Sequence, residues 1–267
     1  MRKNKKVVVV GLGEVGKPIL ELISKRYDAV GVDVSPPAER IERIDFLHVC
    51  YPFQIRDFVD ETARYIKLFK PALTIINSTV GVGTTRAVAE RTGAAVVNSP
   101  VRGKHTRMLD ELRTYTKFVG ALDPATGQHA AKHFELLGLK TKILSSPEAT
   151  ELAKLTETTY FGLMIAWAQE VERYCDQSGQ DYDEIISFYE EIKFFPPVKY
   201  FPGIIGGHCV VPNIEILRKF DNSVILEAIQ ASNRMKIERE AHQDPTGEGL
   251  RALGRPQSDS HELQRHE

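Results

Sequence analysis

Three glycines near the N-terminus have the spacing of a phosphate-binding turn. Gly11, Gly13 and Gly16 form the pattern G-x-G-x-x-G directly after the apolar run Val7-Val10 and before a helix-like stretch. Such glycines permit a tight turn, let the backbone approach a pyrophosphate, and place helix amides against the anion. The sequence therefore predicts a dinucleotide site at this turn.

An acidic residue ends the next apolar run. Asp33 lies 22 positions after Gly11 (33 − 11), where a carboxylate accepts hydrogen bonds from ribose hydroxyls and repels a 2′-phosphate. This spacing favours NAD over NADP. The alternative is that the glycines only turn the chain and Asp33 only caps a loop. We expect the cofactor to be bound by Gly11, Gly13, Glu14, Val15, Gly16 and Asp33.

One cysteine lies in a glycine-rich segment. Cys209 follows His208 within the run from Tyr200 to Asn213. A thiolate is a strong nucleophile, and a cationic neighbour lowers the pKa of a thiol. The alternative is that Cys209 is a small buried hydrophobe, which is the commoner fate of a single cysteine. Cys50 and Cys175 lack comparable surroundings and are predicted to be packing residues.

A metal site is not expected. His129 and His133 are four positions apart, as two ligands on a helix would be. No third ligand accompanies them, so we predict that both lie on a wet helix face.

The first half of the chain alternates short β-branched runs with helix-like stretches, which is typical of parallel strands joined by crossover helices. Pro36 and Pro37 occupy the short interval between Asp33 and Asp45, so the first half of the sheet should be trimmed. The fold class is therefore α/β, with a Rossmann-type, mostly parallel sheet. The predicted strands are Val7-Val10, Ala29-Asp33, Phe46-Cys50, Leu73-Asn77, Ala95-Asn98 and Lys117-Gly120.

The second half is predicted to be all-helical. One long helix should run from Ser146 to about Ser178, followed by a helix at Tyr182-Ile192, a loop at Phe194-Asn213 and a helix at Asn222-Glu240. The polar remainder should be disordered. The predicted domains are thus residues 1–145, 146–241 and a tail at 242–267.

Composition limits the classes of partner. The 35 basic and 36 acidic residues give no positive excess, so nucleic acid is not an expected partner. The apolar run near the N-terminus is too short for a signal peptide, and no stretch reaches the roughly 20 apolar residues of a membrane span. The 3 cysteines cannot pair completely. These features favour a cytoplasmic protein with no membrane partner.

Four segments together resemble the UDP-glucose/GDP-mannose dehydrogenase family. The string PG-x-x-GGHC is similar to its catalytic-cysteine loop, and the segment from Ser78 to Thr85 is similar to a loop at a strand end. Residues 151–160 and 166–179 resemble its lysine-bearing helix, which commonly forms the dimer core. The resemblance covers about residues 5–240 and implies that the family's C-terminal nucleotide-sugar domain is absent.

The resemblance implies an NAD-dependent oxidoreductase that forms a homodimer and oxidises a polar alcohol or aldehyde, with sugar-derived compounds among the candidate substrates. In this reading Cys209 is the nucleophile that traps an aldehyde as a thiohemiacetal. Lys154 stabilises the oxyanion, and Thr79 positions the attacking water. Ser78 and Thr79 would also contact the cofactor.

The chain departs from the family pattern at three positions. Thr158 replaces an Asn, Asn213 replaces an Asp, and Val101 replaces the Glu of a Ser-Pro-Glu motif. Neither Asn nor Val can act as a base, so hydrolysis of a thioester is the step most affected. A basic loop follows Val101. We expect the substrate to contact Arg102, Lys104, His105 and His208; the alternative is that this loop, which also includes Arg107, is a solvated surface.

Two other functions remain open. A two-electron reductase resembling the 3-hydroxyacid dehydrogenases would need Lys154 but not Cys209. A non-catalytic, NAD-binding regulatory protein would need neither residue.

Overall fold

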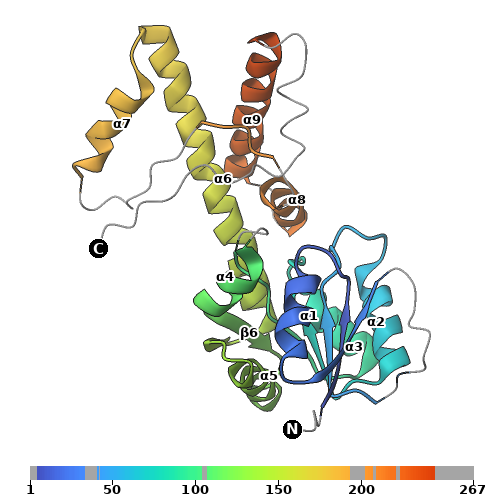
Figure 1. Cartoon of the computed structure of the whole chain (residues 1–267). Coiled ribbons are helices and arrows are strands. Elements are labelled where there is room, and N and C mark those ends of the chain that lie inside the picture. The colour runs from blue at the N-terminus through green and yellow to red at the C-terminus, as the bar shows by residue number, and fades with distance from the viewer. Residues whose placement is uncertain are drawn as a thin grey trace. The chain divides into compact units, whose positions relative to one another are not determined.

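The computed structural model describes residues 5–33, 41, 43–103, 107–192, 202–206, 209–220 and 223–243 (Figure 1). The chain divides into two compact units, residues 1–155 and residues 156–267, which we call the sheet unit and the helical unit. The predicted tail at 242–267 lies almost wholly outside the described residues. The predicted limits at residues 145 and 241 stay predictions.

The sheet unit is built on one sheet of seven strands in the order β2-β1-β3-β4-β5-β6-β7. Every neighbouring pair is parallel except β5 and β6. The predicted mostly parallel, Rossmann-type α/β fold is therefore confirmed. The strands are β1 Lys6–Val10, β2 Asp28–Val32, β3 Phe46–Val49, β4 Leu73–Ile76, β5 Val96–Asn98, β6 Lys117–Ala121 and β7 Thr141–Leu144. The sequence reading missed β7, a four-residue edge strand beginning Thr-Lys.

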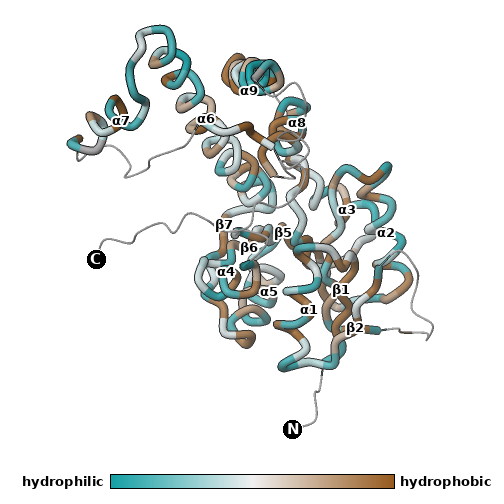
Figure 2. The backbone as a smooth tube through the Cα atoms, turned by 45° about the horizontal axis from the view of Figure 1, so that its top comes forward, coloured by the Kyte–Doolittle hydropathy of each residue, from teal (hydrophilic) through white to brown (hydrophobic). Residues whose placement is uncertain are grey.

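Helices cover both faces of this sheet. Val7 and Val9 point into one apolar cluster with α1 and α5, and Val8 and Val10 point into a second cluster with α2 and α3. Strands buried on both faces have near-continuous apolar sequences, which explains the β-branched runs. Hydrophobic residues accordingly lie along the central strands (Figure 2). The helices are α1 Gly16–Ser24, α2 Phe58–Phe69, α3 Thr84–Thr92, α4 Met108–Thr114 and α5 Pro124–Leu136.

The strand order reverses at β1. Because β2 pairs with one edge of β1 and β3 with the other, the carboxyl ends of β1 and β3 form the topological switch point of the sheet. Ligands of open α/β sheets bind outside such points. Residues 34–40, where the trimming was predicted, lie outside the described residues.

The helical unit contains most of α6 Pro147–Ser178, with α7 Tyr182–Glu190, α8 Val210–Phe220 and α9 Val224–Gln243. The long helix was predicted correctly. The predicted loop through Asn213 was wrong at its end, because α8 begins at Val210. Pro212 lies in the first turn of α8, where the missing N–H breaks no helical hydrogen bond. Val210 and Ile214 are buried and hold this helix against the unit's core.

Gly162 sets the distance between α6 and α8. A Cβ atom at Gly162 would lie 2.5 Å from Cγ1 of Val210, so a larger residue would push α8 away. Val210 and Ile214 share one cluster with Ala166 and Ile229 from α6 and α9. Cys209, directly before α8, is therefore attached to a helix that packs closely on α6.

Candidate functional site

The glycine turn between β1 and α1 has the geometry of a dinucleotide loop. Gly11 has a φ of +88°, and its N–H donates to the Val32 carbonyl oxygen over 2.9 Å. A Cβ atom at Gly16 would lie 1.7 Å from the Gly11 oxygen, whereas a Cβ atom at Gly13 would meet nothing within 4 Å. The first and third glycines are thus required by the turn itself, and the second leaves open space.

The first turn of α1 holds no acidic residue and has no side-chain cap. Val15 is the N-cap and accepts no hydrogen bond through its side chain. The adjacent Glu14 is exposed. The partial positive charge of helix amides at such an end favours a phosphate group.

Asp33 lies at the same end of the sheet. It directly follows β2, is exposed, and is next to Val32, whose carbonyl oxygen binds the N–H of Gly11. The structure therefore brings the predicted carboxylate beside the glycine turn.

The loop after β4 presents Ser78 and Thr79. The Ser78 hydroxyl is buried and donates to the Tyr51 carbonyl oxygen over 2.6 Å, so it joins this loop to the segment after β3. Thr79 is partly exposed. Of the two residues, Thr79 has the side chain that remains accessible at the switch point.

Glu151 is a site residue that the sequence reading missed. Its carboxylate is buried and accepts hydrogen bonds from the N–H groups of Gly83 and Thr85, over 2.6 and 2.8 Å. Burial raises the pKa of Glu151, and these hydrogen bonds act in the opposite direction. Glu151 therefore fixes the first turn of α6 against the start of α3. The partly buried Lys154 follows one helical turn later.

A second lysine lies near Lys154. Lys117 of β6 is 4% exposed, and its ammonium group donates to the carbonyl oxygens of Ser99 and Pro100 over 2.5 and 3.2 Å. Desolvation, opposed in part by Cys50 and assisted by the charge of Lys154, lowers the pKa of Lys117 to about 7. Val101 follows this anchored segment and is buried in the core. The position that departs from the family's carboxylate is thus a packing position.

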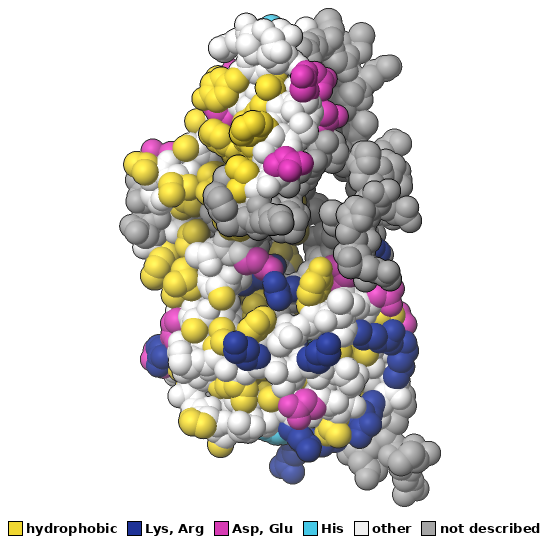
Figure 3. Space-filling model, turned by 90° about the vertical axis from the view of Figure 1, so that its left-hand side faces the viewer, with side chains coloured by type: hydrophobic (Ala, Val, Ile, Leu, Met, Phe, Trp, Pro, Cys, Tyr) yellow, Lys and Arg dark blue, Asp and Glu magenta, His cyan; other side chains and the backbone are white. Residues whose placement is uncertain are grey.

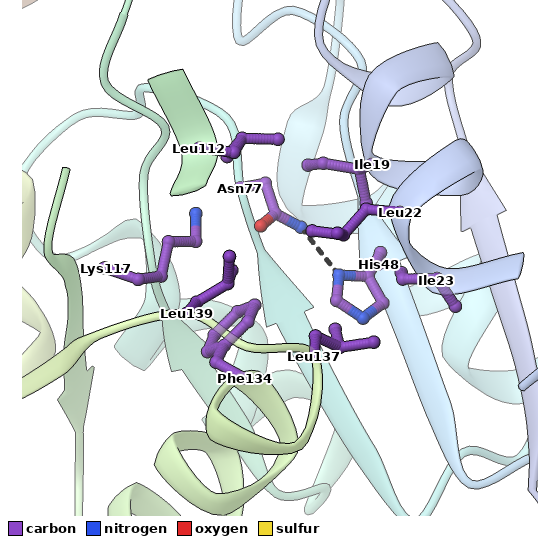
Figure 4. A pocket seen from close by; sticks show the side chains of 10 residues that line it. All are labelled: Ile19, Leu22, Ile23, His48, Asn77, Leu112, Lys117, Phe134, Leu137 and Leu139. Carbon is purple, nitrogen blue, oxygen red and sulfur yellow. Dashed lines mark hydrogen bonds between the residues drawn. The ribbon is translucent and has the colours of Figure 1, made fainter. Parts of the chain in front are cut away.

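A buried polar network lies beneath the sheet's α1 and α5 face. Asn77 Nδ2 lies 3.1 Å from Nδ1 of His48 (Figure 4). Nε2 of His48 lies 3.0 Å from Nε2 of His133. Desolvation lowers the pKa of His48, and lowers that of His133 to about 3. The adjoining cavity of about 10 Å³ has room for about one water molecule, not for a cofactor.

The prediction that His129 and His133 share a wet helix face was wrong for His133. His129 is exposed, but His133 is 1% exposed and stacks on Phe46 with ring centroids 3.9 Å apart. The error arose because α5 packs on the sheet through the face that carries Ala130 and Phe134. Among the described residues no group of three or more His, Cys, Asp or Glu could hold a metal ion.

The predicted substrate-binding residues are only partly described. Lys104, His105 and His208 lie outside the described residues. Arg102 is partly buried, and its guanidinium carbon lies 5.4 Å from the Tyr115 ring centroid and 5.7 Å from that of Phe118. Arg102 thus has aromatic neighbours within cation–π range.

The three cysteines differ in accessibility. Cys209 is exposed, Cys175 is buried and Cys50 is intermediate. Burial raises the pKa of the Cys50 thiol to about 12, which makes it a poor nucleophile. Thr158 on α6 and Asn213 on α8 are both buried. The backbone N–H of Asn213 donates to the Cys209 carbonyl oxygen over 3.2 Å, so these two residues share the first turn at α8.

The second half of the chain matches a known protein family. Residues 148–236 match the model of the UDP-glucose/GDP-mannose dehydrogenase family, central domain. This segment of the chain is similar to the central domain of that family. The matched segment runs from the start of α6 into α9 and includes Lys154 and Cys209. The family resemblance predicted from the sequence is confirmed.

Curated relatives are distant and longer. The NDP-N-acetyl-D-galactosaminuronic acid dehydrogenase of Ralstonia nicotianae is 23% identical, with 76% of this chain and 62% of that protein covered. The UDP-N-acetyl-D-mannosamine dehydrogenase of Methanococcus vannielii is 21% identical, with 87% and 66% covered. The chain therefore spans somewhat less than two thirds of the length of these family members.

Solved structures share the fold. The UDP-D-ManNAc dehydrogenase of Pyrococcus horikoshii has a TM-score of 0.76 at 19% identity, covering 93% of this chain and 72% of that one. The 3-hydroxyisobutyrate dehydrogenase of Mycobacterium tuberculosis has a TM-score of 0.66 at 15% identity, covering 89% and 94%. Within the described residues, none of the helices has the length and apolar character needed to cross a membrane.

Proposed function

We propose that this chain is an NAD-dependent dehydrogenase that oxidises a CH–OH group of a polar, sugar-derived substrate in the cytoplasm. The observation that carries the proposal is the glycine turn at the switch point, where Gly13 leaves space, α1 begins without a capping side chain, and Asp33 lies alongside. The central-domain match and the nucleotide-sugar dehydrogenases among the relatives support the same reaction class.

Asp33 gives the proposal its cofactor preference. An exposed carboxylate directly after β2 accepts hydrogen bonds from the two hydroxyls of an adenosine ribose, and its charge repels a 2′-phosphate. NAD accepts the hydride that leaves the substrate carbon. The chain's own residues bind and orient it through the Gly11 to Gly16 turn, with Ser78 and Thr79 at the next strand end.

The proposed roles of the remaining residues follow from their chemistry. Cys209 would add its sulfur to the carbon of the aldehyde left by the first oxidation, and the thiol proton would pass to the carbonyl oxygen to give a thiohemiacetal. A second NAD⁺ would accept the hydride of that carbon while the hydroxyl proton leaves to water, and water would then cleave the thioester into a carboxylate and the free thiol. Lys154 supplies a positive charge for a developing oxyanion. Thr79 orients the water. Because Val101 and Asn213 cannot act as a base, we expect the thioester to be hydrolysed slowly.

The experiment is a turnover assay with defined substrates. The purified chain is given NAD⁺ together with UDP-N-acetyl-D-mannosamine, UDP-glucose or 3-hydroxyisobutyrate, and NADH is followed by absorbance. We expect NADH from a nucleotide sugar, a weaker response with NADP⁺, and a smaller difference between the cofactors in Asp33→Ala. Absence of both NAD binding by calorimetry and NADH formation would contradict the proposal. Binding without turnover would favour the regulatory alternative.

A specific observation supports one other activity. The 3-hydroxyisobutyrate dehydrogenase structure shares the fold over 89% of this chain, with a TM-score of 0.66. A two-electron 3-hydroxyacid reductase would depend on Lys154 and leave Cys209 idle. Cys209→Ser separates the two activities, because it should abolish aldehyde oxidation in the first and leave turnover unchanged in the second.

We further propose that the chain acts as a homodimer through α6. Phe161 and Trp167 are 46% and 53% exposed on this helix, and hydrophobic side chains gather on the helical unit in one surface view (Figure 3). Val171 of the same helix is buried together with Cys175 of α6 and Ile186 of α7. Light scattering should give about twice the chain mass of 30.0 kDa. A monomer at micromolar concentration would contradict the dimer.

A further inference from the structure

The segment 202–206, which precedes Cys209 in the chain, is held by amide side chains from two helices. Asn233 of α9 pairs with both backbone groups of Ile205: its Oδ1 accepts from the Ile205 N–H over 2.7 Å, and its Nδ2 donates to the Ile205 oxygen over 2.9 Å. A side chain that satisfies the N–H and the C=O of one residue replaces a strand partner. The irregular backbone at Ile205 is thereby fixed.

Gln169 of α6 extends this arrangement to a second point of the segment. Its Nε2 donates to the Gly203 carbonyl oxygen over 2.7 Å and lies 3.3 Å from Oδ1 of Asn233. Its Oε1 accepts from the Ser232 hydroxyl over 3.0 Å. Gln169 and Asn233 are 0% and 8% exposed, so these bonds replace the hydrogen bonds that water would make with their amides.

The cysteine is therefore held from both sides along the chain. Before it, the Ile205 side chain is buried in the cluster that contains Val210 and Ile214. After it, α8 begins at Val210, which lies against Gly162. All of these contacts lie within the helical unit. An exposed thiol whose flanking residues 203–205 and 210–214 are held by packing and hydrogen bonds is the arrangement that a nucleophile needs, because its sulfur must meet an electrophile in one orientation.

We propose that Asn233 and Gln169 are positioning residues for Cys209: they touch neither substrate nor cofactor and act by fixing residues 203–205. The role in turnover rests on the proposed function of Cys209 as nucleophile. That these residues fix the segment and thereby affect the thiol does not depend on the proposed function. The two can therefore be tested separately.

The test compares Asn233→Asp and Gln169→Glu with the control Lys236→Met. The first two variants keep the size and shape of the amide but lose its N–H donors. Lys236 is 7% exposed on the same helix as Asn233 and pairs with Glu172 of α6 over 2.6 Å, so its loss weakens the same helix pair without touching the segment. Urea titration measures the stability that each variant loses.

Two readouts are independent of any substrate. Hydrogen exchange of the peptide covering residues 202–210 should be at least tenfold faster in Asn233→Asp and Gln169→Glu, and unchanged in Lys236→Met. The rate at which iodoacetamide alkylates Cys209, followed by mass spectrometry with Cys175 as an internal reference, should differ at least threefold from that of Lys236→Met. Unchanged exchange, or equal alkylation rates, would overturn the proposal.

Turnover gives the third readout. With the nucleotide sugar that supports NADH formation, both amide variants should lose at least tenfold in kcat, with KM and the Kd for NAD unchanged. Full kcat together with faster exchange would overturn the positioning role. If Cys209→Ser retains the parent activity, the nucleophile assignment fails, and the exchange and alkylation rates then decide the positioning proposal alone.

Discussion

Each unit contains a buried polar network. The hydrogen bonds of one network join side chains to one another, and those of the other join side chains to the backbone of a loop. In the sheet unit His48, His133 and Asn77 bond mainly to one another, and His133 Nδ1 and Asn77 Oδ1 have no partner among the described residues. In the helical unit the amides of Gln169 and Asn233 end on the backbone of Gly203 and Ile205. The first network only fills a core, whereas the second fixes a loop.

The two networks also differ in whether their side chains titrate. Gln169, Asn233 and Ser232 are neutral at every ordinary pH, so they hold the loop independently of acidity. The sheet unit instead buries two histidines and Lys117, whose pKa values burial lowers, so the unfolded chain binds protons more readily than the folded chain. The sheet unit should therefore carry the pH sensitivity of the molecule.

The largest expected effect is acid destabilisation through the two histidines. Unfolding returns their pKa values to about 6.5, while the folded value of His133 is about 3. Between these values the unfolded chain binds more protons, so stability falls as pH falls. The loss through His133 should be about 1.4 kcal/mol per pH unit between these values, and the lowered pKa of His48 should act in the same direction. Urea titrations between pH 6.5 and 4 would measure it.

His133→Leu should make this slope shallower, even though it lowers stability at pH 7 by removing the acceptor for His48. His242→Gln is the control, since His242 is exposed on α9. An equal slope in the parent and in His133→Leu would show that other groups cause the acid loss.

Lys117 should make stability depend on pH in the alkaline range. The pKa of Lys117 is about 7 in the folded chain and 10.5 in its ordinary state, so the unfolded chain holds the extra proton between these values. Stability should rise by about 1.4 kcal/mol per pH unit from pH 7 towards 10. Lys117→Met should lose this rise, as measured by the difference between the two urea titration series. If the stability of the parent and of Lys117→Met rose equally with pH, a group other than Lys117 would cause the rise.

The features that the sequence predicted are local ones. The glycine turn and Asp33 fall within 23 consecutive positions (11 to 33), and their spacing follows from local backbone geometry. Most strands and the long helix α6 were found because strands buried on both faces and long helices leave strong periodic patterns. These features hold the proposed cofactor site.

The residues that the sequence did not reveal act across long separations. Glu151 binds Gly83 from 68 positions away, and Asn233 meets Gln169 across 64. An Asn or Gln within a helix pattern gives no sign of what its amide will meet in the folded chain. His133 was misplaced for the same reason, since its partner His48 lies 85 positions away. Helix α8 was missed because Val-Val-Pro-Asn has weak helix propensity and forms a helix through packing on Gly162.

The smallest expected effect comes from Ser232, which completes the helical network without touching the loop. Its hydroxyl donates to Gln169 Oε1 over 3.0 Å and accepts from Arg173 over 3.0 Å. Ser232→Ala leaves the Gln169 oxygen buried with one partner fewer, so the free energy of unfolding should fall by about 1 to 2 kcal/mol. Because no neutral amide or hydroxyl titrates, this loss should be the same at pH 5, 7 and 9 in urea titrations. A loss that grew towards acid pH would mean that the helical network is coupled to a titrating group, and the contrast between the two units would fail.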